Sequence, residues 1–256
     1  MQTAPKKVIN AWAMYDWANS VYNLVITSTM FPAYYEEITK NPANGNMVTF
    51  LGRTYVNTSL YNYALATGFL IVAIISPILS SIADYRGNKK IFLRFFATLG
   101  SLSCMGLYWF DANNLVIGMI LFVLACVGFW GSLVYYNSYL PEIAAPEDRD
   151  RVSAKGFTYG YIGSVILQLV CFAMVLKHDD FGFTEGLASR YSFLLVGIWW
   201  WGFGQFALSR LPRPAPAGSG DLKHQLLSKG YRELMKVWNQ LKHLPVLKRF
   251  LLAFFF

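Results

Sequence analysis

The sequence has 256 residues, of which 55% are apolar, 17% aromatic and only 14% charged, and its formal net charge is +8. A soluble domain carries about 25% charged residues. The low charge, together with apolar stretches of about 20 residues, excludes soluble globular, disordered and disulfide-stapled secreted classes. Each of the three cysteines lies inside an apolar stretch, which predicts packing residues and neither a metal site nor a disulfide framework.

Apolar stretches bounded by charges, Gly and Pro predict membrane-spanning helices. Each is long enough to cross a hydrocarbon core of about 30 Å as a helix. We therefore expect an all-α integral membrane protein, in which residues 1–211 form a six-helix transmembrane bundle. The predicted spans are residues 11–35, 57–83, 91–110, 115–140, 152–176 and 191–211.

The remaining residues differ in composition. Residues 212–245 open with Pro, Gly and Ser and then place basic residues opposite a periodic apolar face, which predicts a flexible cytoplasmic linker containing an amphipathic helix on the membrane surface. Residues 246–256 are apolar again, but eleven helical residues rise only about 16 Å. We interpret them as the start of a truncated seventh span, and the linker as the connection to a second six-helix half that is missing.

The basic residues predict the orientation. With the N-terminus in the cytoplasm, 18 Lys and Arg residues lie on the inner side and 4 on the outer side, a strong positive-inside bias. The net charge is thus a topology signal whose partner is the lipid bilayer with its anionic headgroups, and nucleic acid is not predicted as a partner. We expect a multi-pass protein of the cell (inner) membrane.

The first span contains the strongest candidate site. Asp16 is the one acidic residue clearly inside a span, and an intramembrane carboxylate is a functional candidate by default. At 100° per residue Asn19, Asn23 and Thr27 share its stripe, and a polar stripe must face protein or a water-filled cavity. This predicts a pathway for a solute or proton, with interhelical hydrogen bonding as the open alternative.

Later spans add weaker candidates. Asn137 near the end of the fourth span and Gln168 within the fifth are candidates for lining the pathway, although helix capping also explains Asn137. Gly156, Gly160 and Ser164 recur every four residues, a small-residue spacing that predicts close helix packing. No metal site and no cofactor are predicted.

Three stretches together resemble a known family. Residues 80–90 (SSIADYRGNKK) are similar to the cytoplasmic loop motif Gly-x-x-x-Asp-Arg-x-Gly-Arg-Lys of the major facilitator superfamily, with Asp84, Gly87 and Lys89 matching and Ser80, Tyr85 and Asn88 departing. Residues 10–20 (NAWAMYDWANS) and 135–143 (YYNSYLPEI) narrow the resemblance to bacterial relatives of the autophagy-related vacuole effluxer family.

The resemblance covers the N-terminal half of the family fold. It implies a secondary transporter of about twelve helices, with eukaryotic relatives associated with amino-acid export from the vacuole. In the superfamily the loop Asp forms part of a cytoplasmic gate with the other half, a role that the resemblance assigns to Asp84, Gly87, Lys89 and Lys90, with Glu142 as a candidate to join them.

The function we expect is secondary active transport of a small solute by alternating access, with a proton or cation as the candidate coupling ion and no enzymatic activity. A phosphate-binding loop and the common hydrolase and metalloprotease motifs are absent from this sequence. A cation-coupled sugar symporter, a membrane enzyme and a non-transporting scaffold remain as alternatives.

Overall fold

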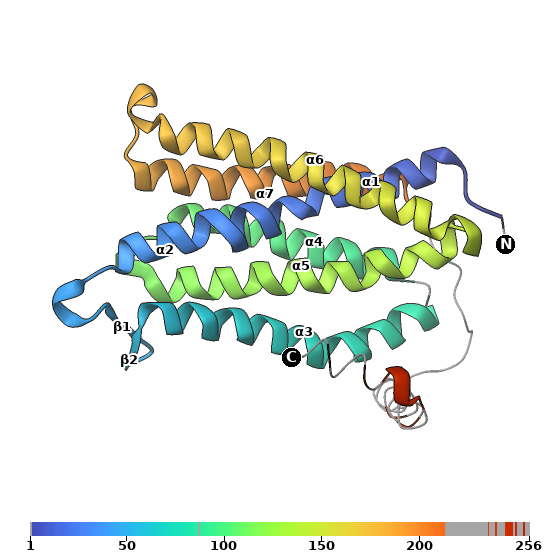
Figure 1. Cartoon of the computed structure of the whole chain (residues 1–256), viewed down its shortest axis with the longest axis horizontal. Helices are drawn as coiled ribbons and strands as arrows, with labels where there is room; N and C mark the ends of the chain where they lie inside the picture. Colours follow the sequence, from blue (N-terminus) through green and yellow to red (C-terminus); the bar gives the residue numbers. More distant parts are fainter. Residues whose placement is uncertain are drawn as a thin grey trace. The chain divides into compact units, whose positions relative to one another are not determined.

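The apolar stretches form helices in the computed structural model of the chain (Figure 1). The structure describes residues 2–86 and 88–212, together with eight positions between 235 and 253; the predicted linker of 212–245 and the predicted seventh span of 246–256 fall largely outside the described residues. The side chains of residues 78–79 and 81–86 are not described either. Each of the six predicted spans coincides with helical segments, apart from the last residues of the third and sixth, Phe110 and Leu211, which lie just after a helix ends. The helical segments are α1 (Lys6–Val21), η1 (Tyr22–Met30), α2 (Phe31–Thr39), α3 (Asn57–Arg86), α4 (Lys89–Gly106), α5 (Leu115–Ile143), α6 (Arg149–Leu176) and α7 (Glu185–Arg210).

The expectation of an all-α membrane fold is confirmed. Within the described part of the chain, four helices are long and apolar enough to cross a membrane: Asn57–Pro77, Lys89–Trp109, Ala112–Ile143 and Pro146–Leu176. The predicted first span is one continuous helical path made of α1, η1 and α2. Its middle part, η1, is a π-helix, whose i→i+5 hydrogen bonds place more residues in each turn than an α-helix does.

A short β-hairpin is a feature that the sequence reading did not predict. Strands β1 (Met47–Phe50) and β2 (Arg53–Val56) pair antiparallel, with Met47 opposite Val56. The turn between them places Leu51 at φ 49° and Gly52 at φ 77°. Two consecutive positive φ angles form the turn type that matches the strand twist. The hairpin lies at the end of the bundle away from the N-terminus (Figure 1).

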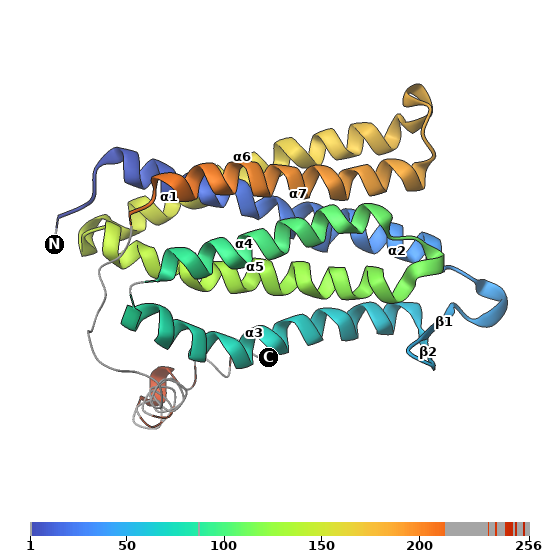
Figure 2. The ribbon, with the colours of Figure 1, turned by 180° about the vertical axis from the view of Figure 1, so that it is seen from behind.

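The chain divides into two compact units. One contains residues up to Val72 and the segment Lys90–Pro212, and the other contains Ala73–Lys89 and the residues from Arg213 onward. In the first unit α1 lies beside α6 and α7, and the view from behind shows α4 beside α5 (Figure 2). The candidate residues of α1, α5 and α6 all belong to this unit.

Small residues bring the helices of this unit into close contact. A β-carbon on Gly128 of α5 would lie 2.4 Å from Gly100 Cα of α4, and one on Gly100 would lie 2.2 Å from the Trp200 ring of α7. Lipid tails are as apolar as the side chains, so packing of this kind, rather than water exclusion, holds membrane helices together. Trp200 is fully buried, and its indole fits against α4 because Gly100 has no side chain.

An aromatic cluster fills the other end of the unit. Phe31, at the start of α2, is fully buried and stacks on Phe122 with ring centroids 4.1 Å apart. The rings of Phe110, Phe193 and Tyr61 also pack around Phe31, with centroid distances of 5.7, 6.0 and 6.1 Å. Offset-stacked and tilted rings of this kind add stabilisation beyond the area that they bury.

Candidate functional site

Asp16 lies in the seam between α1 and α6. Its side chain is 8% exposed, and the hydroxyl of Ser20, one turn further along α1, donates a hydrogen bond of 2.8 Å to Asp16 Oδ1. On α6, a β-carbon at Gly160 would lie 2.6 Å from Ser20 Oγ and 3.1 Å from Asp16 Cγ. The carboxyl group therefore occupies the seam because α6 has no side chain at this position.

Two further glycines extend this seam. A β-carbon on Gly156 would lie 2.7 Å from the ring of Trp12, and one on Gly163 would lie 2.8 Å from the backbone oxygen of Trp17. The hydroxyl of Ser164 instead donates to the Gly160 carbonyl oxygen of its own helix at 2.7 Å. A turn-by-turn row of glycines thus lets the backbone of α1 approach α6 around Asp16.

The predicted polar stripe of the first span does not share one environment. Asp16 and Asn19 are buried, Asn23 is exposed and Thr27 is half-buried. The geometry changes from α to π at Tyr22, so the 100° spacing on which the stripe was predicted does not continue through Asn23 and Thr27. Asn19 is fully buried, and neither atom of its amide group has a hydrogen-bond partner within the described part of the chain.

Gln168 of α6 contacts a residue that the sequence reading missed. The Thr29 hydroxyl donates to Gln168 Oε1 at 2.8 Å, while Gln168 Nε2 is buried without a partner among the described residues. Thr29 also reaches back to the Leu24 carbonyl oxygen at 2.9 Å, five residues earlier, which is the π-helical spacing. The Val25 carbonyl oxygen, four residues earlier, lies at 3.0 Å from the same hydroxyl. Thr29 was outside the predicted stripe, so the sequence analysis gave no signal for its contact with α6.

Aromatic side chains join α5 to α1 next to Asp16. Trp12 Nε1 donates to the Tyr136 carbonyl oxygen at 3.0 Å, and the two rings stack with centroids 4.4 Å apart. Tyr15 packs on the same tyrosine at 5.3 Å. The neighbouring Asn137, a predicted pathway residue, is exposed and does not enter this aromatic layer.

Of the predicted gate residues, Lys90 and Glu142 belong to the first unit, and Glu142 lies at the end of this unit that carries the N-terminus, where the Ala4 amide donates to the Ile143 carbonyl oxygen. Lys90 Nζ donates to the Leu211 carbonyl oxygen at 2.5 Å, just after α7 ends, which satisfies a carbonyl that a helix terminus leaves open. Glu142 is half-buried in the last turn of α5, and Lys89 begins α4. Asp84 lies in α3 with its side chain outside the description, and Gly87 lies outside the described residues.

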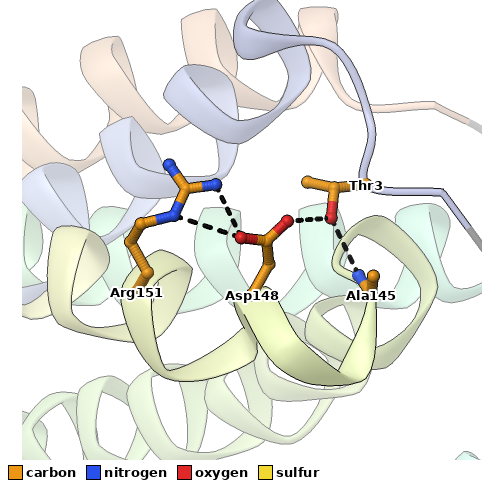
Figure 3. A network of polar contacts seen from close by, with 4 residues as sticks. All are labelled: Thr3, Ala145, Asp148 and Arg151. Carbon is orange, nitrogen blue, oxygen red and sulfur yellow. Dashed lines mark hydrogen bonds and ion pairs between the residues drawn. The ribbon is translucent and has the colours of Figure 1, made fainter.

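A polar network at this end ties the N-terminal segment to the turn between α5 and α6 (Figure 3). The Thr3 hydroxyl donates to Asp148 Oδ2 at 2.5 Å and accepts from the Ala145 amide at 3.1 Å. Arg151 forms an ion pair of 2.8 Å with the other oxygen of Asp148. The sequence analysis assigned no role to Thr3 or to Asp148.

This network affects the ionisation of Asp148. The predicted fifth span begins at residue 152, after the charged turn that contains Asp148, so we expect this carboxyl group to lie outside the apolar layer. Hydrogen bonds from Thr3 and Arg151 hold the pKa of the Asp148 carboxyl below its usual range. A lowered pKa means that the carboxylate stabilises the folded network above the unfolded-state pKa, and that this contribution is lost as the pH falls through the folded-state value.

The described residues hold no cluster of three or more His, Cys, Asp or Glu side chains that would bind a metal ion. What the Asp16 site offers chemically is a single carboxyl group, a hydroxyl donor and uncommitted amide atoms inside an apolar layer. A carboxyl group in such surroundings is chemically able to exchange a proton, or to hold a monovalent cation or water.

Comparison with known proteins gives consistent matches. The family model described as "Vacuole effluxer Atg22 like" matches residues 4–256. The chain is 29% identical over 249 residues to the uncharacterized MFS-type transporter YxiO of Bacillus subtilis, covering 96% of this chain and 56% of the relative. It is 24% identical to autophagy-related protein 22 of Kluyveromyces lactis, covering 95% of this chain and 55% of that protein.

A solved structure shares the fold. The proton:xylose symporter XylE of the major facilitator superfamily superposes with a TM-score of 0.59 at 16% identity, covering 81% of this chain and 45% of that one. The chain thus spans about half the length of the proteins that it matches. The resemblance to the superfamily and to the effluxer family, first read from three short stretches, is confirmed.

Proposed function

This chain belongs to the vacuole effluxer Atg22-like family, and from that premise we propose that it forms one six-helix half of a secondary transporter that moves a small solute across a membrane by alternating access. The second half and the lipid bilayer are its partners. The superfamily fold supports the proposal, and the buried Asp16 is the observation that carries its mechanism.

In this proposal Asp16 is the site of the coupling ion. A carboxylate in an apolar layer is costly unless it is protonated or paired, and the Ser20 hydroxyl is one donor to it. On α6, the backbone of Gly160 packs directly against the Asp16 carboxyl group. Binding a proton or a cation here removes the cost of the charge, so occupancy of Asp16 favours one arrangement of α1 against α6 over another.

The solute contacts in this proposal come from polar side chains on several helices. Asn23 and Asn137 are exposed and offer amide donors and acceptors to a solute between the halves. Asn19, Thr27 and Gln168 carry buried polar atoms, which water or the solute satisfies when α1 moves. The segment from Asp84 to Lys90, with Glu142, closes the cytoplasmic side against the second half.

Amino acids are the first solutes to test, because the family resemblance points to them. Sugars are the second, because the superposed structure is that of a proton:xylose symporter. Competition of the flux by unlabelled amino acids against unlabelled sugars separates the two. A scaffold without transport activity would show no solute-dependent flux at all.

The experiment measures solute flux against a pH gradient in proteoliposomes that contain both halves of the transporter. We expect Asp16→Asn to keep solute binding and to abolish the dependence of flux on the pH gradient, because the amide takes up no proton at any pH in the range tested.

Asp179→Asn is the matched control. The Asp179 side chain is 92% exposed, so its substitution should leave the pH dependence unchanged. Proton coupling that survives Asp16→Asn would contradict the assignment of Asp16 as the coupling-ion site. A wild-type protein that moves no solute would contradict the proposed transport activity itself.

A further inference from the structure

An apolar groove lies on the surface of the first unit, where α1, α6 and α7 meet. Its volume is about 460 Å³, and no charged side chain lines it. The residues that shape it include Met14, Leu167, Trp199, Gly202, Phe203 and Phe206. It is separate from the Asp16 seam, because Asp16 and Gly160 are not among its lining residues.

The groove is preformed. A β-carbon on Gly202 would meet no atom within 4 Å, so the space in front of this lining residue is empty. Trp199 forms one wall and is fixed by a hydrogen bond of 3.1 Å from its Nε1 to the Trp17 carbonyl oxygen. Phe203 packs on Trp199 with ring centroids 4.7 Å apart. A ligand therefore has little ordering of side chains to induce.

Positive charge lies at one end of this groove. The guanidinium carbon of Arg210 is 3.6 Å from the ring centroid of Phe206, a lining residue, and Arg210 itself is exposed. On α1, one turn before Met14, Asn10 accepts a hydrogen bond of 2.6 Å from Lys155 Nζ. Figure 2 shows the last turns of α7 beside the first turns of α1, so both cations belong to the same end.

We propose that this groove is a binding site for an anionic phospholipid, with an acyl chain along the apolar surface at Gly202 and the phosphate at Arg210, while Lys155 adds positive charge at the same end. The positive charge of Arg210 at the end of an apolar groove complements the negative headgroup of such a lipid. An apolar helix of a partner protein needs no cation at the groove end, whereas the headgroup of an anionic lipid lies at the level where a spanning helix ends. The site does not depend on the proposed transport.

The test measures lipids retained by the purified chain. The chain is reconstituted in phosphatidylcholine nanodiscs with a minor share of phosphatidylglycerol and released in mild detergent, and native mass spectrometry counts the bound lipids. We expect phosphatidylglycerol to be enriched about fivefold over its share, since one basic residue near the surface has an effect of that size. Arg210→Gln should remove this enrichment, and Gly202→Leu should reduce retention by filling the space in front of residue 202.

Two variants serve as matched controls. Arg53→Gln removes an exposed arginine on β2, at the other end of the bundle. Gly186→Leu adds the same side chain to the same helix at a position where the nearest atom to a β-carbon is 3.6 Å away. Both should keep the enrichment.

Equal retention of phosphatidylglycerol in the wild type and in Arg210→Gln would overturn the proposal, as would an equal loss in Arg53→Gln. A dimer that Gly202→Leu breaks would also overturn it, because a second copy would then occupy the groove. If Gly202→Leu does not fold, the lipid enrichment measured for the surface variant Arg210→Gln still tests the proposal.

Discussion

Gly160 is the residue at which one methyl group decides the packing of the candidate site. A β-carbon there lies 2.6 Å from Ser20 Oγ, so Ser20 has to turn away and give up its hydrogen bond to Asp16. We expect Gly160→Ala to lower the free energy of unfolding by about 1–3 kcal/mol, the usual cost of overpacking. The melting temperature of the purified chain in detergent measures the effect.

Gly202→Ala is the control for this substitution. It adds the same methyl group to a helix, at a position where no atom lies within 4 Å. Replacing a helical glycine by alanine without a clash should stabilise the chain by about 0.5–1 kcal/mol. The two variants should therefore shift the melting temperature in opposite directions, and a shift of the same sign would contradict the packing argument.

At this scale the sequence indicated the site residue but not its surroundings. Asp16 stands out because it is an acid within an apolar run. Gly160 stands out for its four-residue spacing, yet its meeting with Ser20 at one carboxyl group depends on how α1 and α6 pack. The contact of Trp12 with Tyr136 likewise joins residues 124 apart in sequence, and no local pattern encodes it.

At the scale of elements, the contact between η1 and α6 depends on a hydroxyl group. Thr29 donates to Gln168 Oε1, and Gln168 is a buried amide. Thr29→Val keeps the shape and removes the donor. We expect a loss of about 1 kcal/mol in the free energy of unfolding, the typical size of an interhelical hydrogen bond in a membrane protein, measured by thermal melting in detergent.

Ser28→Ala tests whether this effect is specific to the contact with α6. Ser28 lies on the same π-helix, and its hydroxyl donates to the Asn23 carbonyl oxygen of its own segment from an exposed position. The variant should change the melting temperature little. A loss equal to that of Thr29→Val would mean that the hydroxyl groups stabilise the π-helix itself and not the contact with α6.

The elements were predictable to different degrees. Long apolar runs define the six helical spans because a bilayer admits little else, and the structure places a helix at each. The β-hairpin escaped prediction because its strands are four residues long and its turn is Leu51–Gly52 rather than the usual Asn-Gly. The π-helix escaped because the sequence reading assumed 100° per residue throughout.

At the scale of the whole molecule, charge and burial bear on one question, the orientation in the membrane. The segment between the fourth and fifth predicted spans carries Arg149 and Arg151, and the segment between the second and third carries Lys89 and Lys90, so the sequence pattern assigns all four to one side of the membrane. The loops at the other end carry few basic residues. The positive-inside rule therefore predicts that the N-terminus and the Thr3–Asp148 network lie in the cytoplasm.

Labelling of single introduced cysteines tests this orientation. The native Cys104, Cys126 and Cys171 are free and buried, so a membrane-impermeant maleimide should leave the unmodified chain unlabelled. In intact cells Asp179→Cys, before α7, should be labelled at once because its side chain is exposed. Asp150→Cys, exposed at the start of α6, should be labelled only after the cells are permeabilised. The reverse pattern would invert the topology, and it would then place the gate loop and the Arg210 end of the lipid groove on the outer side, where the excess of anionic headgroups that motivates the lipid site is absent.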